Sequence, residues 1–94
     1  ATYYYPGGGF GACGWPINDW DMAVALGPDH WDNGAHCGQQ ITVTFGGTTI
    51  CAIVADECPG CQVPNGIDLT QGAMATLDPN WFAHGVDTVQ WGFA

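Results

Sequence analysis

Two cysteines and two aspartates lie close together in the segment VADECPGCQVPNGIDLT, residues 54–70. Cys58 and Cys61, separated by Pro-Gly, have the spacing of a redox dithiol or of half a zinc site. A redox dithiol normally opens a helix, whose dipole lowers the pKa of the first thiol, and the QVPNGID that follows cannot form one. Zinc would need two further ligands, and the three histidines show no paired spacing. The pattern favours a structural disulfide, with no metal ion and no cofactor.

Asp56 and Asp68 are the best candidates for acid chemistry. Asp56 ends the apolar run AIVAD, and Asp68 lies between Ile67 and Leu69. Apolar surroundings and a like-charged neighbour raise the pKa of a carboxyl group. The chain has no Lys or Arg to lower it again. Such a group suits a general acid acting on a glycosidic oxygen. The alternative is that each aspartate only caps a strand end.

The charge balance limits the partners. Nine acidic residues and no Lys or Arg give a formal net charge of −9. Contacts with nucleic-acid phosphates and with anionic membranes need cations, so neither partner is expected. The composition indicates a neutral or cationic partner, or acids that only keep the surface solvated.

The chain is rich in aromatic residues, with five Trp, three Tyr and four Phe. Trp15 and Trp20 lie in segments rich in Gly, Pro, Asn and Asp, where a tryptophan is seldom a core residue. The flat C–H faces of sugar rings stack on such side chains, and sugar hydroxyls suit Asp and Asn acceptors. In the first strand, alternation places Thr2 and Tyr4 on one face. A neutral polysaccharide is the ligand class that needs aromatics and acids but no cations.

The elements that position these residues are short. Ninety-four residues form one domain, and 15 Gly and six Pro favour an all-β body. Thr70 can cap a helix over 71–77, which residues 78–80 end. The expected strands are 1–6, 21–26 (or one helical turn), 39–45, 48–56, 66–69 and 85–93. Six strands without exposed edges predict a small closed barrel.

Taken in order, ATYYYP, GACGW, HCGQQITVTF, VADECPGC, IDLT and VQWGF resemble the single-domain, expansin-related proteins of fungi called loosenins over essentially the whole chain. This resemblance implies an all-β fold, a six-stranded double-psi β-barrel with one or two short helices, shared with expansins, barwin-like proteins and RlpA-like domains. It implies a single domain over residues 1–94, without the carbohydrate-binding second domain of expansins.

The resemblance also assigns roles to residues. Asp68, in IDLT, matches the acid essential in expansins and the catalytic acid of related endoglucanases, and Asp56 matches a second groove aspartate. Thr2 and Tyr4 match groove-lining positions on the first strand. The endoglucanases carry their catalytic base where this chain has Pro6, which argues against two-carboxylate hydrolysis.

For the five cysteines, relatives with this barrel imply a Cys13–Cys37 disulfide, which leaves Cys58–Cys61 as the second. Cys51 then stays unpaired, as a departure from loosenin-like chains, and is expected to be a buried free thiol. A Cys51–Cys58 pair is the alternative. So many cysteines in a short chain suggest an extracellular, secreted protein, and its first residues read as the start of a mature chain.

The sequence therefore predicts a secreted monomer that binds cell-wall polysaccharide (cellulose, chitin or hemicellulose) in an acidic groove and loosens it without hydrolysis. Asp68 and Asp56 are the essential carboxyl groups, and Thr2, Tyr4, Trp15 and Trp20 bind the glycan. One alternative is a glycan-cleaving enzyme with Asp68 as general acid, either a lytic transglycosylase or an endoglucanase using Asn18 or Asp21 as base. The other is a barwin-type effector or defence module that binds protein.

Overall fold

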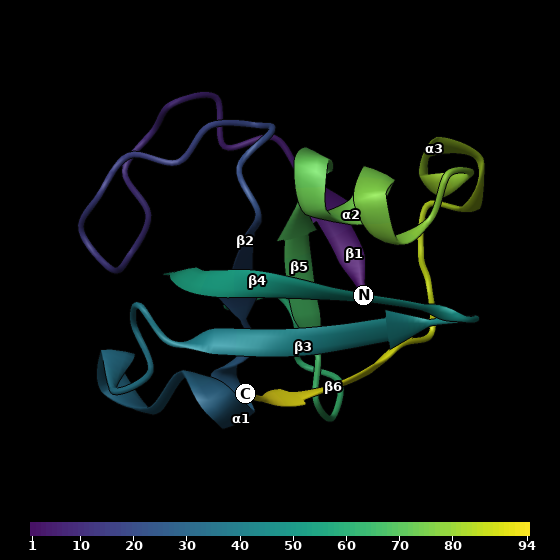
Figure 1. Cartoon of the computed structure of the whole chain (residues 1–94). Helices are drawn as coiled ribbons and strands as arrows, with labels where there is room; N and C mark the ends of the chain where they lie inside the picture. Colours follow the sequence, from purple (N-terminus) through teal and green to yellow (C-terminus); the bar gives the residue numbers. More distant parts are fainter.

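The computed structural model describes residues 1–94 and contains one six-stranded sheet in the order β1-β5-β2-β4-β3-β6 (Figure 1). The strands are β1 (Thr2–Tyr4), β2 (Ala23–Leu26), β3 (Gln40–Phe45), β4 (Thr48–Glu57), β5 (Ile67–Thr70) and β6 (Gln90–Phe93). The helices are α1 (Pro28–Trp31), the 3₁₀ turn η1 (Asp32–Gly34), α2 (Gln71–Leu77) and α3 (Trp81–His84). None of the helices has the length and apolar character needed to span a membrane.

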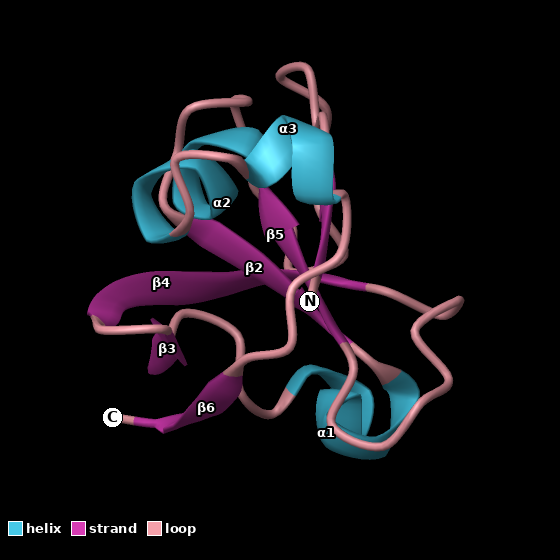
Figure 2. Cartoon of the chain, turned by 90° about the vertical axis from the view of Figure 1, so that its right-hand side faces the viewer, coloured by secondary structure: helices cyan, strands magenta, loops and turns pink.

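The sheet mixes parallel and antiparallel pairs. β1 runs parallel to β5, and β2 runs antiparallel to β5 but parallel to β4. β3 pairs antiparallel with both β4 and β6. In Figure 1 the β3–β4 hairpin crosses the direction of β2 and β5, and Figure 2 shows α2 and α3 together at one end with α1 at the other. The strands therefore wrap around a shared interior and place β1, β5, β2 and β4 side by side.

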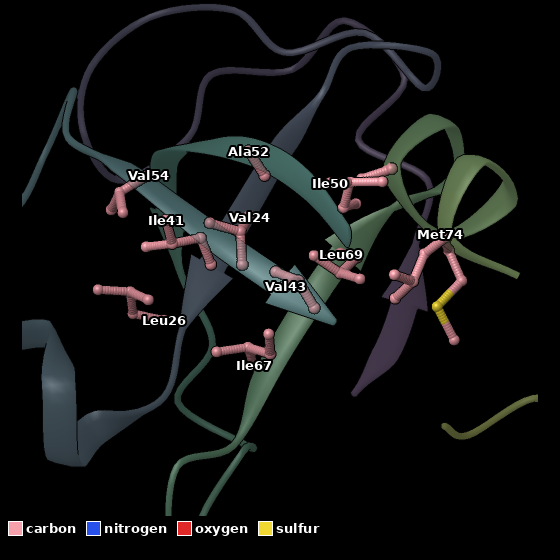
Figure 3. Packing of buried hydrophobic residues seen from close by; sticks show 12 residues of the cluster. Val24, Leu26, Ile41, Val43, Ile50, Ala52, Val54, Ile67, Leu69 and Met74 are labelled. Atoms are coloured by element: carbon pink, nitrogen blue, oxygen red, sulfur yellow. The ribbon is translucent and has the colours of Figure 1, made fainter. Parts of the chain in front are cut away.

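The core is built from alternate residues of the strands and one face of α2. Twelve buried residues form the main cluster, shown in Figure 3, which includes Val24 and Leu26 of β2, Leu69 of β5 and Met74 of α2. A smaller cluster of Ile17, Ala23 and Ala55 lies on the other face of the sheet. Both faces of β2 are therefore buried.

The predicted hairpin and helix are present. Residues 40–45 and 48–57 pair across the Gly46-Gly47 turn. The Thr70 hydroxyl accepts a hydrogen bond from the Ala73 backbone N–H and caps α2, which ends at Leu77. The segment 21–26, for which a single helical turn was the alternative, forms the fully buried strand β2.

The last strand is shorter than the predicted 85–93, because β6 begins only at Gln90, and residues 81–84 form the unpredicted helix α3. Gly85 adopts φ +73°, which ends α3 in a left-handed conformation suited to glycine. The Asp87 N–H then donates to the Ala1 carbonyl at 2.9 Å. Asp87 therefore contacts the start of the chain, and only residues 90–93 pair with β3.

The structure contains the disulfides Cys13–Cys37 and Cys58–Cys61. Cys51 is free, but the expectation that it is buried was wrong, since it is exposed. The reason is strand alternation in β4: Ile50 and Ala52 face the core, so Cys51 points outward, opposite Thr42 of β3.

Candidate functional site

The register of four neighbouring strands brings the two candidate acids into one row. Thr2 of β1 pairs with Asp68 of β5, Asp68 pairs with Ala25 of β2, and Ala25 pairs with Asp56 of β4. Residues paired across strands face the same side of a sheet. Thr2, Asp68, Ala25 and Asp56 therefore form what we call the acidic row, with the small side chain of Ala25 between the two carboxyl groups.

Asp56 is held by three hydrogen-bond donors. Its Oδ1 accepts from the backbone N–H groups of Ala12 at 2.7 Å and Glu57 at 2.8 Å. Its Oδ2 accepts from the Tyr4 hydroxyl at 3.3 Å. Burial raises the pKa of Tyr4 and the Asp56 carboxylate raises it further, so the phenol stays a donor at ordinary pH. Asp56 is thus a fixed acceptor.

Asp68 is held more loosely. Its one side-chain partner is the Thr2 hydroxyl, which donates to Oδ1 at 2.8 Å. Burial raises the pKa of Asp68, and the nearby Asp56 raises it too, whereas the Thr2 hydrogen bond and the Ala1 amino group lower it in part. The result is a carboxyl group with a pKa above its ordinary value and an oxygen free to meet a ligand.

The acidic row lies between a cavity and an aromatic loop. Beyond Thr2 opens a cavity of about 510 Å³ whose lining includes Ile67 and Val86. The Cys58–Cys61 disulfide forms part of its wall. Sequence reasoning missed this cavity, because Val86 is 84 positions from Thr2 and no local pattern links them.

Trp15 and Trp20 both lie in the loop between β1 and β2 and are exposed to 37% and 66%. The Trp15 carbonyl accepts from the Gly11 N–H, next to the Ala12 that binds Asp56. The loop of Trp15 therefore flanks the Asp56 end of the acidic row. The backbone of Trp20 lies against Gly72 at the start of α2, where a Cβ would come within 2.5 Å of the Trp20 carbonyl oxygen. Neither indole hydrogen-bonds to Asp56 or Asp68.

Trp81 and the alternative bases lie away from the acidic row. Trp81 is half-buried in α3, packs against the core and meets the Tyr3 ring edge-on at 4.8 Å. Asn18 and Asp21, the alternative bases, contact each other, since the Asn18 N–H donates to Asp21 Oδ2 at 2.8 Å. Neither contacts the acidic row by a hydrogen bond.

Comparisons with known proteins agree with this architecture. No family model matches the chain. The solved structure of the Streptomyces papain inhibitor superposes with a TM-score of 0.84 at 37% identity, over 99% of this chain and 88% of that one. The chain belongs to the papain-inhibitor family of double-psi β-barrels. The curated papain inhibitor of Streptomyces mobaraensis is 37% identical over 83 residues, which are 81% of this chain.

Bacterial expansin is a second neighbour of this papain-inhibitor family member. A mutant Clavibacter michiganensis expansin solved in complex with cellohexaose has a TM-score of 0.86 at 28% identity, over 99% of this chain but 47% of its own. An allergen homologue of Arthroderma benhamiae is 40% identical over 76 residues. The chain spans 57% of the curated papain inhibitor and 25% of the allergen homologue. The predicted six-stranded double-psi β-barrel is confirmed.

Proposed function

We propose that the chain is an extracellular protein that binds cell-wall polysaccharide in the groove of the acidic row and loosens it without hydrolysis. The observation that carries the proposal is the row itself: Thr2, Asp68 and Asp56 on one face, with the Tyr4 hydroxyl above Asp56. The expansin that superposes on the whole chain was solved with cellohexaose, a neutral glycan. Two disulfides in so small a chain fit an extracellular location.

Loosening without hydrolysis follows from the unequal environments of the two acids. Inverting hydrolysis needs a general acid and a second carboxylate that accepts a proton from water. Asp68 suits the first role, but the oxygens of Asp56 already accept three hydrogen bonds. Asp68 and Thr2 are instead placed to exchange hydrogen bonds with sugar hydroxyls and so compete with bonds between glycan chains.

The test is a comparison of cellulose binding and cellulose weakening by the parent chain and by Asp68→Asn. Asp32→Asn is the matched control, since it removes the same charge at an exposed residue outside the row. We expect Asp68→Asn to lose the weakening activity and Asp32→Asn to keep it, with no release of reducing sugars by either. Reducing ends released by the parent and lost in Asp68→Asn would indicate a glucanase, and anhydro ends a lytic transglycosylase.

Inhibition of a cysteine peptidase is the second candidate, because the papain inhibitor is 37% identical to this chain and 88% of its length is covered. A papain assay separates the two functions. Inhibition at micromolar concentration, with no affinity for insoluble polysaccharide, would favour the inhibitor. Glycan binding that depends on Asp68, with no inhibition, would favour the loosening protein.

A further inference from the structure

Outside the groove, three ionisable side chains converge where α2 and α3 end. Asp78 directly follows α2, His84 is the last residue of α3, and Asp87 lies three residues further on. One ligand atom from each lies within 4.8 Å of the others. No hydrogen bond joins these side chains to the acidic row. Sequence reasoning overlooked them because it looked for paired histidines or a second Cys-x-x-Cys.

The two carboxyl groups are buried, and the cationic groups beside them are the half-exposed His84 imidazole and the Ala1 amino group. Asp78 and Asp87 are 2% and 3% exposed, and the chain contains no Lys or Arg. Asp87 Oδ2 has no hydrogen-bond partner. The amino group of Ala1 donates to the backbone carbonyl of Asp87, which leaves that carboxyl oxygen unsatisfied. Buried carboxylates are normally paired with a cation or bound to a metal ion.

The geometry is close to that of a three-ligand metal site. His84 Nδ1 lies 2.6 Å from Asp78 Oδ2 and 3.6 Å from Asp87 Oδ1. Ligand atoms about 2.0–2.1 Å from a tetrahedral zinc ion are separated by about 3.3 Å from one another. The His84–Asp87 distance is therefore slightly longer than this. The His84–Asp78 distance is shorter because the two groups share a hydrogen bond, and it lengthens when a metal ion replaces the Nδ1 proton. His84 is half exposed, so an ion has a path from solvent.

We propose that Asp78, His84 and Asp87 bind one zinc-like divalent cation. Imidazole nitrogen with carboxylate oxygens suits Zn²⁺, whereas Mg²⁺ and Ca²⁺ prefer oxygen ligands alone. The ion would add positive charge beside both buried carboxylates, with water in the fourth position. Since it displaces the His84 Nδ1 proton, binding weakens as pH falls.

A shared proton is the competing occupant of the cluster. Burial raises the pKa of Asp87, and the neighbouring Asp78 carboxyl raises it further. Burial also raises the pKa of Asp78, but hydrogen bonds from His84 and Asn80 bring it below its ordinary value. A proton held by Asp87 against Asp78 would satisfy the cluster without a metal ion, and the two cases differ in whether zinc binds.

The experiment is calorimetric titration of the metal-stripped full chain with Zn²⁺, in a Cys51→Ser background that removes the exposed thiol. We expect one zinc ion per chain, and an affinity lowered by roughly tenfold or more in His84→Gln and in Asp87→Asn. His84 is half exposed, so His84→Gln keeps the test valid if Asp87→Asn fails to fold. Zinc should also raise the unfolding temperature of the parent and leave that of His84→Gln unchanged.

His30→Gln is the matched control, because His30 Nε2 lies 3.8 Å from an exposed carboxylate, that of Asp29, without a second acid nearby. Its zinc affinity should equal that of the parent. No heat at millimolar zinc, binding of parental affinity in His84→Gln, or binding lost in His30→Gln would each overturn the proposal. These readouts are independent of polysaccharide binding.

Discussion

Asp56 and Asp68 are chemically identical residues that flank the same alanine, yet their surroundings give them different properties. Three donors hold Asp56 in place. Asp68 accepts a side-chain hydrogen bond only from the Thr2 hydroxyl, and its partial burial raises its pKa. A row with one fixed acceptor and one adaptable carboxyl group suits reversible binding better than proton transfer between two carboxylates.

The raised pKa of Asp68 should make the free energy of unfolding depend on pH. Because burial favours the neutral carboxyl, its contribution to stability is complete below the unfolded pKa of about 3.9 and is lost as pH rises through the higher folded value. Asn cannot ionise. At about pH 7, we therefore expect Asp68→Asn to unfold at a temperature equal to or higher than that of the parent. The difference in unfolding temperature between the variant and the parent should become smaller at acidic pH. Thermal unfolding across this pH range measures it, and a variant that is less stable only at neutral pH would contradict it.

The size of residue 25 should decide whether a glycan chain can lie over the acidic row. Ala25 is buried between Asp68 and Asp56, and Ala25→Val adds two methyl groups there. Overpacking costs about 1–3 kcal/mol. We expect the folded variant to lose cellulose binding in a pull-down. Ala23→Val, on the same strand in the small core cluster, should lose stability but keep binding. Equal binding by both variants would show that the groove lies elsewhere.

At the scale of elements, the two disulfides differ in the loops that they close. Cys13–Cys37 spans 24 positions and ties the β1–β2 loop to the segment before β3. Cys58–Cys61 spans three positions and forms part of the cavity wall. The first disulfide therefore restrains the unfolded chain more, whereas the second fixes part of the wall of the cavity next to the acidic row.

Removing each disulfide should separate these roles. On the chain-entropy model, replacing Cys13 and Cys37 by Ala costs about 3.5 kcal/mol of unfolding free energy, and replacing Cys58 and Cys61 by Ala about 1.5 kcal/mol. We expect the replacement of Cys58 and Cys61 to reduce glycan binding more than its small effect on the free energy of unfolding suggests. Urea unfolding and a cellulose pull-down test both effects. A larger loss of stability from the shorter loop would contradict the entropic reasoning.

Elements with a strong local signal were predicted from the sequence. The β3–β4 hairpin and α2 match their predicted ranges within a residue or two, because alternation, a two-glycine turn and the Thr70 cap all act locally. α3 and the shortened β6 were not predicted. Between them, Asp87 forms backbone hydrogen bonds with Ala1, which lies 86 positions away, so no local pattern marks where β6 begins.

The candidate site was predicted only in part from the sequence. The sequence singled out Asp56 and Asp68 by their apolar flanks, but the register that places both beside Ala25 spans three strands and has no local signature. Family resemblance supplied Thr2 and Tyr4. The cluster around Asp87 escaped notice because its members lie on separate turns whose closeness only the tertiary structure shows.

For the whole molecule, a net charge of −9 lies on a body of 31 × 26 × 23 Å. The repulsion between it and any acidic matrix extends about 30 Å at 0.01 M salt and about 3 Å at 1 M. A neutral glycan experiences no such force. Under the proposed function, charge should therefore contribute to selection among wall polymers before any contact with the acidic row.

Salt should reveal this selection. We expect binding to neutral cellulose to change little between low and high salt, and binding to pectin, which carries acidic sugars, to improve as salt rises or pH falls. Pull-down across a salt series measures both, with cellulose as the internal control. Salt-independent binding to pectin would contradict the electrostatic account.

The outward position of Cys51 has a practical consequence. It is the single free thiol, exposed on β4, five residues before Asp56 in the same strand. A maleimide dye attached there would sit on the outer surface of the barrel and move rigidly with the strand that carries a groove acid. The native chain thus offers one defined labelling position for fluorescence measurements of ligand engagement, without an engineered cysteine.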